Sequence, residues 1–129
     1  VVKGNNLKGF SRAIVVTCCQ SFYDNNGTRH VNKVPAKKTG CKNVTIEGNT
    51  ISNAGGNLKA AGIMVTSLFK EVIHSNIVIL KNNLNLNNPN SKYDIYVSYA
   101  NTVTVKKDNK CKLAIKVESE TTNNVVVEK

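Results

Sequence analysis

The sequence of 129 residues predicts an all-β chain, wound as a right-handed parallel β-helix of about four coils. Two short strand patterns recur along it, and both carry apolar residues at every second position. Such alternation turns one row of side chains inward. Matching copies are separated by inserted segments of different length. This is typical of stacked coils, in which equivalent strands superpose and loops absorb the insertions.

The first strand pattern is an Ile and a Val two residues apart, with an unconstrained residue between them. Its four copies align without gaps at residues 13–18, 62–67, 94–99 and 114–119. Because equivalent positions superpose in stacked coils, we expect one interior row made of Ile14, Ile63, Ile95 and Ile115.

The second strand pattern is a short run rich in Val and Ile, followed by a polar bend. Its copies lie at residues 44–46, 77–79, 103–105 and 125–127, and a truncated copy opens the chain at residues 1–2. Many of the 20 asparagines fall in the bends, at residues 4–6, 48–50, 81–83 and 107–109. Stacked identical amides bond to one another, which predicts a hydrogen-bonded ladder of Asn5, Asn49 and Asn82.

An antiparallel sandwich is the alternative architecture, because it also contains short strands separated by turns. Its strands need not resemble one another, however, whereas here the same order of strand, turn, strand and bend is repeated. A helical repeat would need an apolar stripe with a period of 3.6 residues, which these units lack. Stacked coils are therefore favoured.

Two segments interrupt the repeats. Residues 19–42 form a long inserted loop, in which Asn26-Gly27 is a hairpin-turn signal; loops of this length are usually functional or disordered. Residues 68–75 are expected to form a single helical turn or an irregular loop.

The chain is predicted to be a single β-helix domain over residues 1–129. It starts within a strand pattern and stops just after another, and the open ends of a coil stack need covering. We therefore expect a piece of a longer solenoid, or an oligomer such as a trimer whose neighbouring chains cover the ends.

Three stretches, GIMVTS, SNIVILKNNLNL and CKNVTIEGNTISN, resemble the repeats of the pectate-lyase-like β-helix superfamily. That superfamily includes polysaccharide lyases, glycoside hydrolases, epimerases and phage tailspikes. The resemblance covers nearly the whole chain except residues 19–42. It implies that substrate lies along one outward strand face bordered by loops, with the matching substrate-binding residues here being Tyr93, Tyr96, Tyr99, Lys92 and Lys70.

Two outward columns are predicted on the first strand pattern: Val15, Met64, Tyr96 and Lys116, and beside them Thr17, Thr66, Ser98 and Glu118. Tyrosine rings stack on sugar faces and their hydroxyls bond sugar hydroxyls. Three tyrosines within residues 93–99 therefore suggest a glycan surface; the alternative is three surface tyrosines at a strand edge.

Catalytic groups are less clearly indicated. Glycoside hydrolysis uses two carboxylates about 5–10 Å apart. The candidates are Glu71, Asp94, Glu118 and Glu120, and none of them forms a stacked pair at adjacent outward positions. Lyase chemistry needs a base, for which Lys116 and His74 are candidates. The acids do not cluster as a calcium site would require, so no metal and no cofactor is predicted.

The net charge of +10 favours polyanionic partners. The densest basic groups lie at residues 33–42 and 106–112, without a nucleic-acid-binding motif, so an acidic polysaccharide is favoured over nucleic acid. The sequence has no apolar run long enough to cross a membrane. Four cysteines lack CxxC spacing; either a Cys18–Cys41 bridge closes the long loop or the thiols are buried and free.

Three functions follow. The leading hypothesis is a polysaccharide-recognising module, tailspike-like or part of a carbohydrate-active protein, that is extracellular or virion-associated. The first alternative is a portion of a polysaccharide lyase or glycoside hydrolase. The second alternative is a purely structural β-solenoid.

Overall fold

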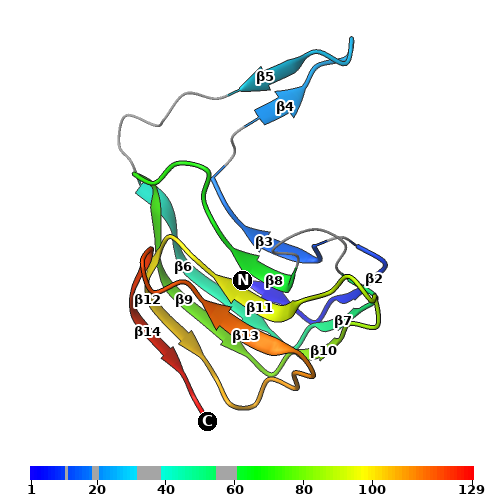
Figure 1. The fold of residues 1–129 in the computed structure, drawn as a ribbon, viewed down its shortest axis with the longest axis vertical. Helices are drawn as coiled ribbons and strands as arrows, with labels where there is room; N and C mark the ends of the chain where they lie inside the picture. The colour runs from blue at the N-terminus through cyan, green and yellow to red at the C-terminus, as the bar shows by residue number, and fades with distance from the viewer. Residues whose placement is uncertain (11, 19–20, 32–38, 55–60) are drawn as a thin grey trace.

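The computed structural model describes residues 1–129 except residues 11, 19–20, 32–38 and 55–60 (Figure 1). The described residues form fourteen strands and no helix. The strands belong to three parallel sheets and one antiparallel hairpin. The all-β prediction is therefore confirmed.

Sheet one is the largest and contains the second strand pattern. Its strands lie in the order β1, β6, β9, β12 and β14, and every neighbouring pair is parallel. Their bounds are Val2–Lys3, Thr39–Glu47, Ile73–Leu80, Ala100–Val105 and Thr122–Val127.

Sheets two and three are also wholly parallel. Sheet two contains three short strands, β2 (Asn6–Lys8), β7 (Thr50–Ser52) and β10 (Asn83–Asn85). Sheet three contains the first strand pattern, in the order β3, β8, β11 and β13, with bounds Ile14–Val16, Ala61–Val65, Tyr93–Val97 and Ala114–Val117.

The chain visits the three sheets repeatedly in the same order. One passage through sheets one, two and three, here called a coil, is made by β1 to β3, the next by β6 to β8, and the third by β9 to β11. The fourth runs from β12 to β13, with a parallel bridge between Asn83 and Lys110 in place of a strand in sheet two. The three sheets surround a common interior in Figure 1.

Equivalent residues superpose from coil to coil, as the sequence pattern predicts. Ile14 pairs with Ile63, Ile63 with Ile95, and Ile95 with Ile115. The first three of these side chains belong to the buried core, and Ile115 packs against it from the outermost coil. The predicted interior row is therefore confirmed.

The core is filled by aliphatic residues from all three sheets. Side chains that exclude solvent almost completely include Ile46, Ile51, Ile63, Ile77, Ile79, Leu84, Ile95, Val97 and Val103. Gly62 lies where an added Cβ would meet Leu84 Cδ2 at 2.8 Å, so this position of the core leaves no room for a side chain without repacking.

An asparagine ladder joins the bends that follow sheet one. Asn5 donates through Nδ2 to Asn49 Oδ1, Asn49 to Asn82, and Asn82 to Asn109, each at 2.9 Å. The backbone N–H of each donor residue bonds the same oxygen as its side chain. The predicted ladder is confirmed and is one member longer, because Asn109 takes the equivalent place in the fourth coil.

A second column of aligned residues bends every long strand of sheet one. Asn43, Asn76, Thr102 and Asn124 lie opposite one another in register, and all four have φ between 51° and 57°. Asn tolerates this left-handed region, whereas a β-branched residue is strained in it. Thr102 is the strained member of the column.

Two predicted boundaries are wrong. β6 begins at Thr39, inside the predicted loop of residues 19–42, and β9 begins at Ile73, inside the segment predicted as a helical turn or irregular loop. Both strands extend because they pair with each other, Thr39 with Ile73 and Lys42 with Ser75. Sequence periodicity does not show this extension, because apolar and polar residues do not alternate regularly at the start of either strand.

The predicted turn at Asn26-Gly27 is confirmed. It joins β4 (Ser21–Tyr23) and β5 (Arg29–Val31), an antiparallel hairpin that stands apart from the three sheets in Figure 1. Asp24 Oδ1 accepts the N–H groups of Asn26 and Thr28, both at 2.9 Å, and Gly27 adopts a φ of 77°. Asp24 Oδ2 also pairs with His30 at 2.8 Å.

Asn82→Ala should lower the free energy of unfolding by about 3 kcal/mol, because it leaves buried partners on both sides of the ladder unsatisfied. Asn5→Ala, at the exposed end of the same ladder, is the matched control and should cost less than about 1 kcal/mol. Urea unfolding monitored by circular dichroism measures both. Equal losses would contradict a ladder that stabilises the stack from within.

Thr102→Asn should raise the free energy of unfolding by about 1 kcal/mol, since it removes a β-branched residue from the left-handed region. Thr104→Asn, two residues along the same strand at ordinary β geometry, should instead lower it slightly. A thermal melt that shows the same change for both variants would argue against strain at Thr102.

Candidate functional site

The two predicted outward columns are present on sheet three. Val15, Met64, Tyr96 and Lys116 face one another in register across the four strands. Backbone hydrogen bonds continue this register one residue further: Thr66 N–H to Val16 O at 3.0 Å, Ser98 to Val65 and Glu118 to Val97, both at 2.9 Å. The second column is therefore Thr17, Thr66, Ser98 and Glu118, as predicted.

A groove of about 500 Å³ lies over these columns. It crosses the strands from β3 to β13, a distance of about 14 Å for three strand spacings. Its lining residues are Arg12, Val15, Thr17, Met64, Thr66, Ser67, Leu68, Tyr96, Ser98, Tyr99 and Glu118.

Tyr96 forms the floor of the groove rather than an exposed platform. Its side chain is only 3% exposed and packs with Met64 and Ala61, while Tyr93 covers it with ring centroids 5.8 Å apart. Its hydroxyl donates a hydrogen bond to Glu118. Burial, and then this carboxylate, raise the pKa of Tyr96. The expectation of an exposed Tyr96 ring is therefore wrong.

Polar groups run along the second column. Ser98 Oγ lies 3.3 Å from Thr66 Oγ1 and 3.2 Å from Val65 O. Arg12 and Glu118 belong to opposite edges of sheet three, so one cationic and one anionic group lie at the two ends of the groove. Between them, Val15, Leu68 and Tyr99 add apolar surface.

His74 lies behind the groove and not in it. Its side chain is fully buried in β9; Nε2 lies 2.8 Å from Thr66 O and Nδ1 accepts the N–H of Cys41 at 2.9 Å. Since a carbonyl can only accept and an amide N–H can only donate, the ring is neutral with its proton on Nε2. Burial lowers the pKa of His74. His74 therefore helps to position Thr66 by donating a hydrogen bond to its carbonyl oxygen.

Asp94 is also separated from the groove. It is fully buried, and Oδ2 accepts the N–H groups of Lys112 and Leu113, both at 2.6 Å. Burial raises the pKa of this carboxyl, against the effect of the two hydrogen bonds. Asp94 thus holds the connection that leads into β13, and it does not pair with Glu118.

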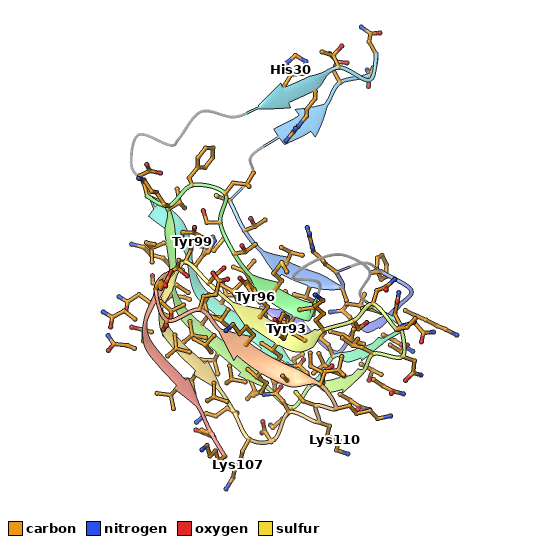
Figure 2. All side chains as sticks on the ribbon, in the orientation of Figure 1. His30, Tyr93, Tyr96, Tyr99, Lys107 and Lys110 are labelled. Atoms are coloured by element: carbon orange, nitrogen blue, oxygen red, sulfur yellow. The ribbon has the colours of Figure 1, made fainter. Side chains whose placement is uncertain are left out.

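The structure brings together only some of the predicted site residues. Tyr96, Tyr99 and Glu118 line the groove, and Tyr93 packs against the ring of Tyr96. Figure 2 labels the three tyrosines. The three predicted lysines, Lys70, Lys92 and Lys116, are exposed and do not line it. Three lining residues belong neither to the predicted site nor to the predicted columns. Ser67 is the last residue of a copy of the first strand pattern, and Arg12 and Leu68 flank copies of that pattern. Their position at the ends of these copies was the available signal.

The basic groups lie elsewhere. Figure 2 shows Lys107 and Lys110 at the bends, away from the three tyrosines. Most of the other predicted basic group, residues 33–42, lies outside the described residues, as does Cys19. No disulfide joins Cys18 to Cys41, so the Cys18–Cys41 bridge is not present. Cys41 is exposed, which differs from the prediction of buried thiols.

The part of the chain that the structure describes contains neither a cluster of metal ligands nor a membrane-spanning helix. No three His, Cys, Asp or Glu side chains in it are grouped closely enough to hold a metal ion. None of its segments is a helix of the length and apolar character needed to span a bilayer.

Comparison with protein-family models, curated proteins and solved structures finds no match to the chain.

The stability of the protein should fall as the pH drops below about 6.5, the ordinary pKa of histidine. Because burial lowers the pKa of His74, the unfolded chain binds a proton that the folded chain excludes, so the stabilisation is complete above this pH and is lost below it.

Thermal unfolding at pH 8, 7, 6 and 5 measures this dependence. His74→Gln should flatten the curve between pH 7 and 5, because it removes the buried imidazole whose pKa is lowered. A curve that His74→Gln leaves as steep as before would show that another group controls the pH dependence.

Proposed function

We propose that this chain is a polysaccharide-binding module built on a right-handed parallel β-helix, and that the glycan lies in the groove over sheet three. The observation that carries the proposal is the composition of that groove. It has a volume of about 500 Å³ and is lined by both apolar side chains and hydroxyl groups. A sugar ring has an apolar C–H face and a rim of hydroxyls, and it needs both kinds of partner.

The individual side chains supply both. Tyr99, Leu68 and Val15 offer apolar surface to a sugar face. Thr17 and Thr66 offer hydroxyl groups beside it, in a row whose spacing is fixed by strand pairing. A row of side chains repeated at strand spacing suits a linear polymer better than a compact ligand.

Charge refines the proposed ligand. The net charge of +10 and the placement of Arg12 in the groove favour a polysaccharide with some acidic units, bound near β3. Glu118 at the other end accepts the hydroxyl of Tyr96, which fits a role in holding the floor of the groove and bonding sugar hydroxyls.

The β-helix itself is supported by the repeated order of the sheets and by the sequence resemblance. Connections between parallel strands of one sheet are almost always right-handed. On this proposal the chain acts outside the cell or on a virion, and the other chains of a trimer cover the edge strands of its sheets.

Leu68→Ala should weaken glycan binding roughly fivefold, the effect of removing about 1 kcal/mol of apolar contact. Leu68 is 67% exposed, so the change should leave stability nearly intact. Affinity electrophoresis against a panel of acidic and neutral polysaccharides identifies the glycan and measures the loss.

Val126→Ala is the matched control, because this residue is 54% exposed but belongs to β14 in sheet one. It should leave retention unchanged. Failure of every polysaccharide to retard the protein would contradict the proposal. Release of unsaturated or reducing ends would instead identify the alternative, a polysaccharide lyase or glycoside hydrolase.

A further inference from the structure

A second depression, of about 410 Å³, lies where the chain turns from sheet three into sheet one. Its lining includes Ile73, Tyr99, Asn101 and Asn123, with Lys70 and Glu120. Tyr99 lines the groove over sheet three as well, so this one side chain lies between the two cavities.

The backbone of Tyr99 is held in an unfavourable conformation. Its φ is 48°, in the left-handed region that bulky side chains rarely adopt. The strained residue is fixed on both sides, because its N–H donates to Thr121 Oγ1 at 3.2 Å and its carbonyl accepts the N–H of His74 at 2.9 Å. A tight connection of two residues, Ser98 and Tyr99, between β11 and β12 imposes this geometry.

Asn or Gly would adopt the same backbone conformation at a lower cost in free energy. Asn does so at three positions of the aligned column in sheet one. The ring of Tyr99 is not buried in the core, so packing does not repay the strain. Backbone strain at a residue that lies between two cavities is typical of a residue that binds a ligand.

The polar groups of the second depression point to an uncharged ligand. Asn123 is exposed, and its side-chain amide bonds no other described residue. Asn101 Oδ1 accepts from Thr102 and Asn124, both at 3.3 Å, which leaves its Nδ2 to donate. Lys70 and Glu120 carry opposite charges, so the depression as a whole attracts neither anions nor cations.

We propose that this depression is a second subsite for the same glycan, which takes an uncharged sugar unit and shares Tyr99 with the groove. The inference rests on the proposed function, since it extends the path of the polymer around the corner between sheets three and one. A linear glycan would then contact both cavities, while a disaccharide would occupy the groove alone.

The test compares disaccharides with hexasaccharides of the cello-, xylo-, manno- and malto- series, together with the hexasaccharide of any polysaccharide that retards the protein. Isothermal titration calorimetry should give a hexasaccharide that binds at least tenfold more tightly than its disaccharide. Asn123→Ala should remove most of that gain and leave the disaccharide affinity unchanged. Asn90→Ala, an exposed asparagine outside both cavities, should change neither.

Tyr99→Asn adds a readout that a structural role would not give. It should raise the melting temperature, because the strain is relieved, and lower the affinity for the hexasaccharide. A melting temperature that falls would assign Tyr99 to packing and overturn the inference.

The two proposals fail differently. Equal affinity for both lengths, or a length dependence that Asn123→Ala leaves intact, would overturn the second subsite while the Leu68→Ala effect still supported the groove. Binding that depends on Asn123 but not on Leu68 would overturn the groove and keep the second depression as a site. Absence of binding by every oligosaccharide would overturn both.

Discussion

The structure depends on the in-register stacking of equivalent residues between parallel strands. Stacking aligns Ile14, Ile63 and Ile95 in the core, and it gives each amide of the asparagine ladder a matching amide in a neighbouring coil. A slip of one residue would turn the aliphatic rows outward and break the ladder at the same time. Register is therefore specified twice, once by apolar burial and once by directional hydrogen bonds.

The same constraint builds the surface on which function is proposed. Because the inner row is fixed, the outer row must also align, so Thr17, Thr66 and Ser98 lie at strand spacing without any additional device. His74 adds to this by holding the carbonyl of Thr66 from behind. The residues that line the groove are thus held in position by neighbouring residues that stabilise the fold.

Sequence reasoning recovered the parts of this protein that repeat. The four Ile-Val pairs and the bend asparagines are recognisable because they recur, and the outward columns follow from period two.

Sequence reasoning did not predict that Tyr96 is covered, because the covering side chains, Tyr93 and Met64, pack against it in a way that no local pattern shows. It also placed Asp94 and His74 at the surface, since polar residues inside a sheet give no sequence sign of their buried partners. The starts of β6 and β9 were missed because pairing between distant segments, and not local alternation, extends both strands.

Hydrogen–deuterium exchange of the protein with and without a retained polysaccharide tests the central claim most directly. The account predicts slower exchange in residues 12–18, 62–68 and 96–99, which border the groove, with little change at the basic bend of residues 106–112. Protection centred on residues 106–112, with the strands of sheet three unaffected, would show that charge alone drives the association and would contradict a built glycan site.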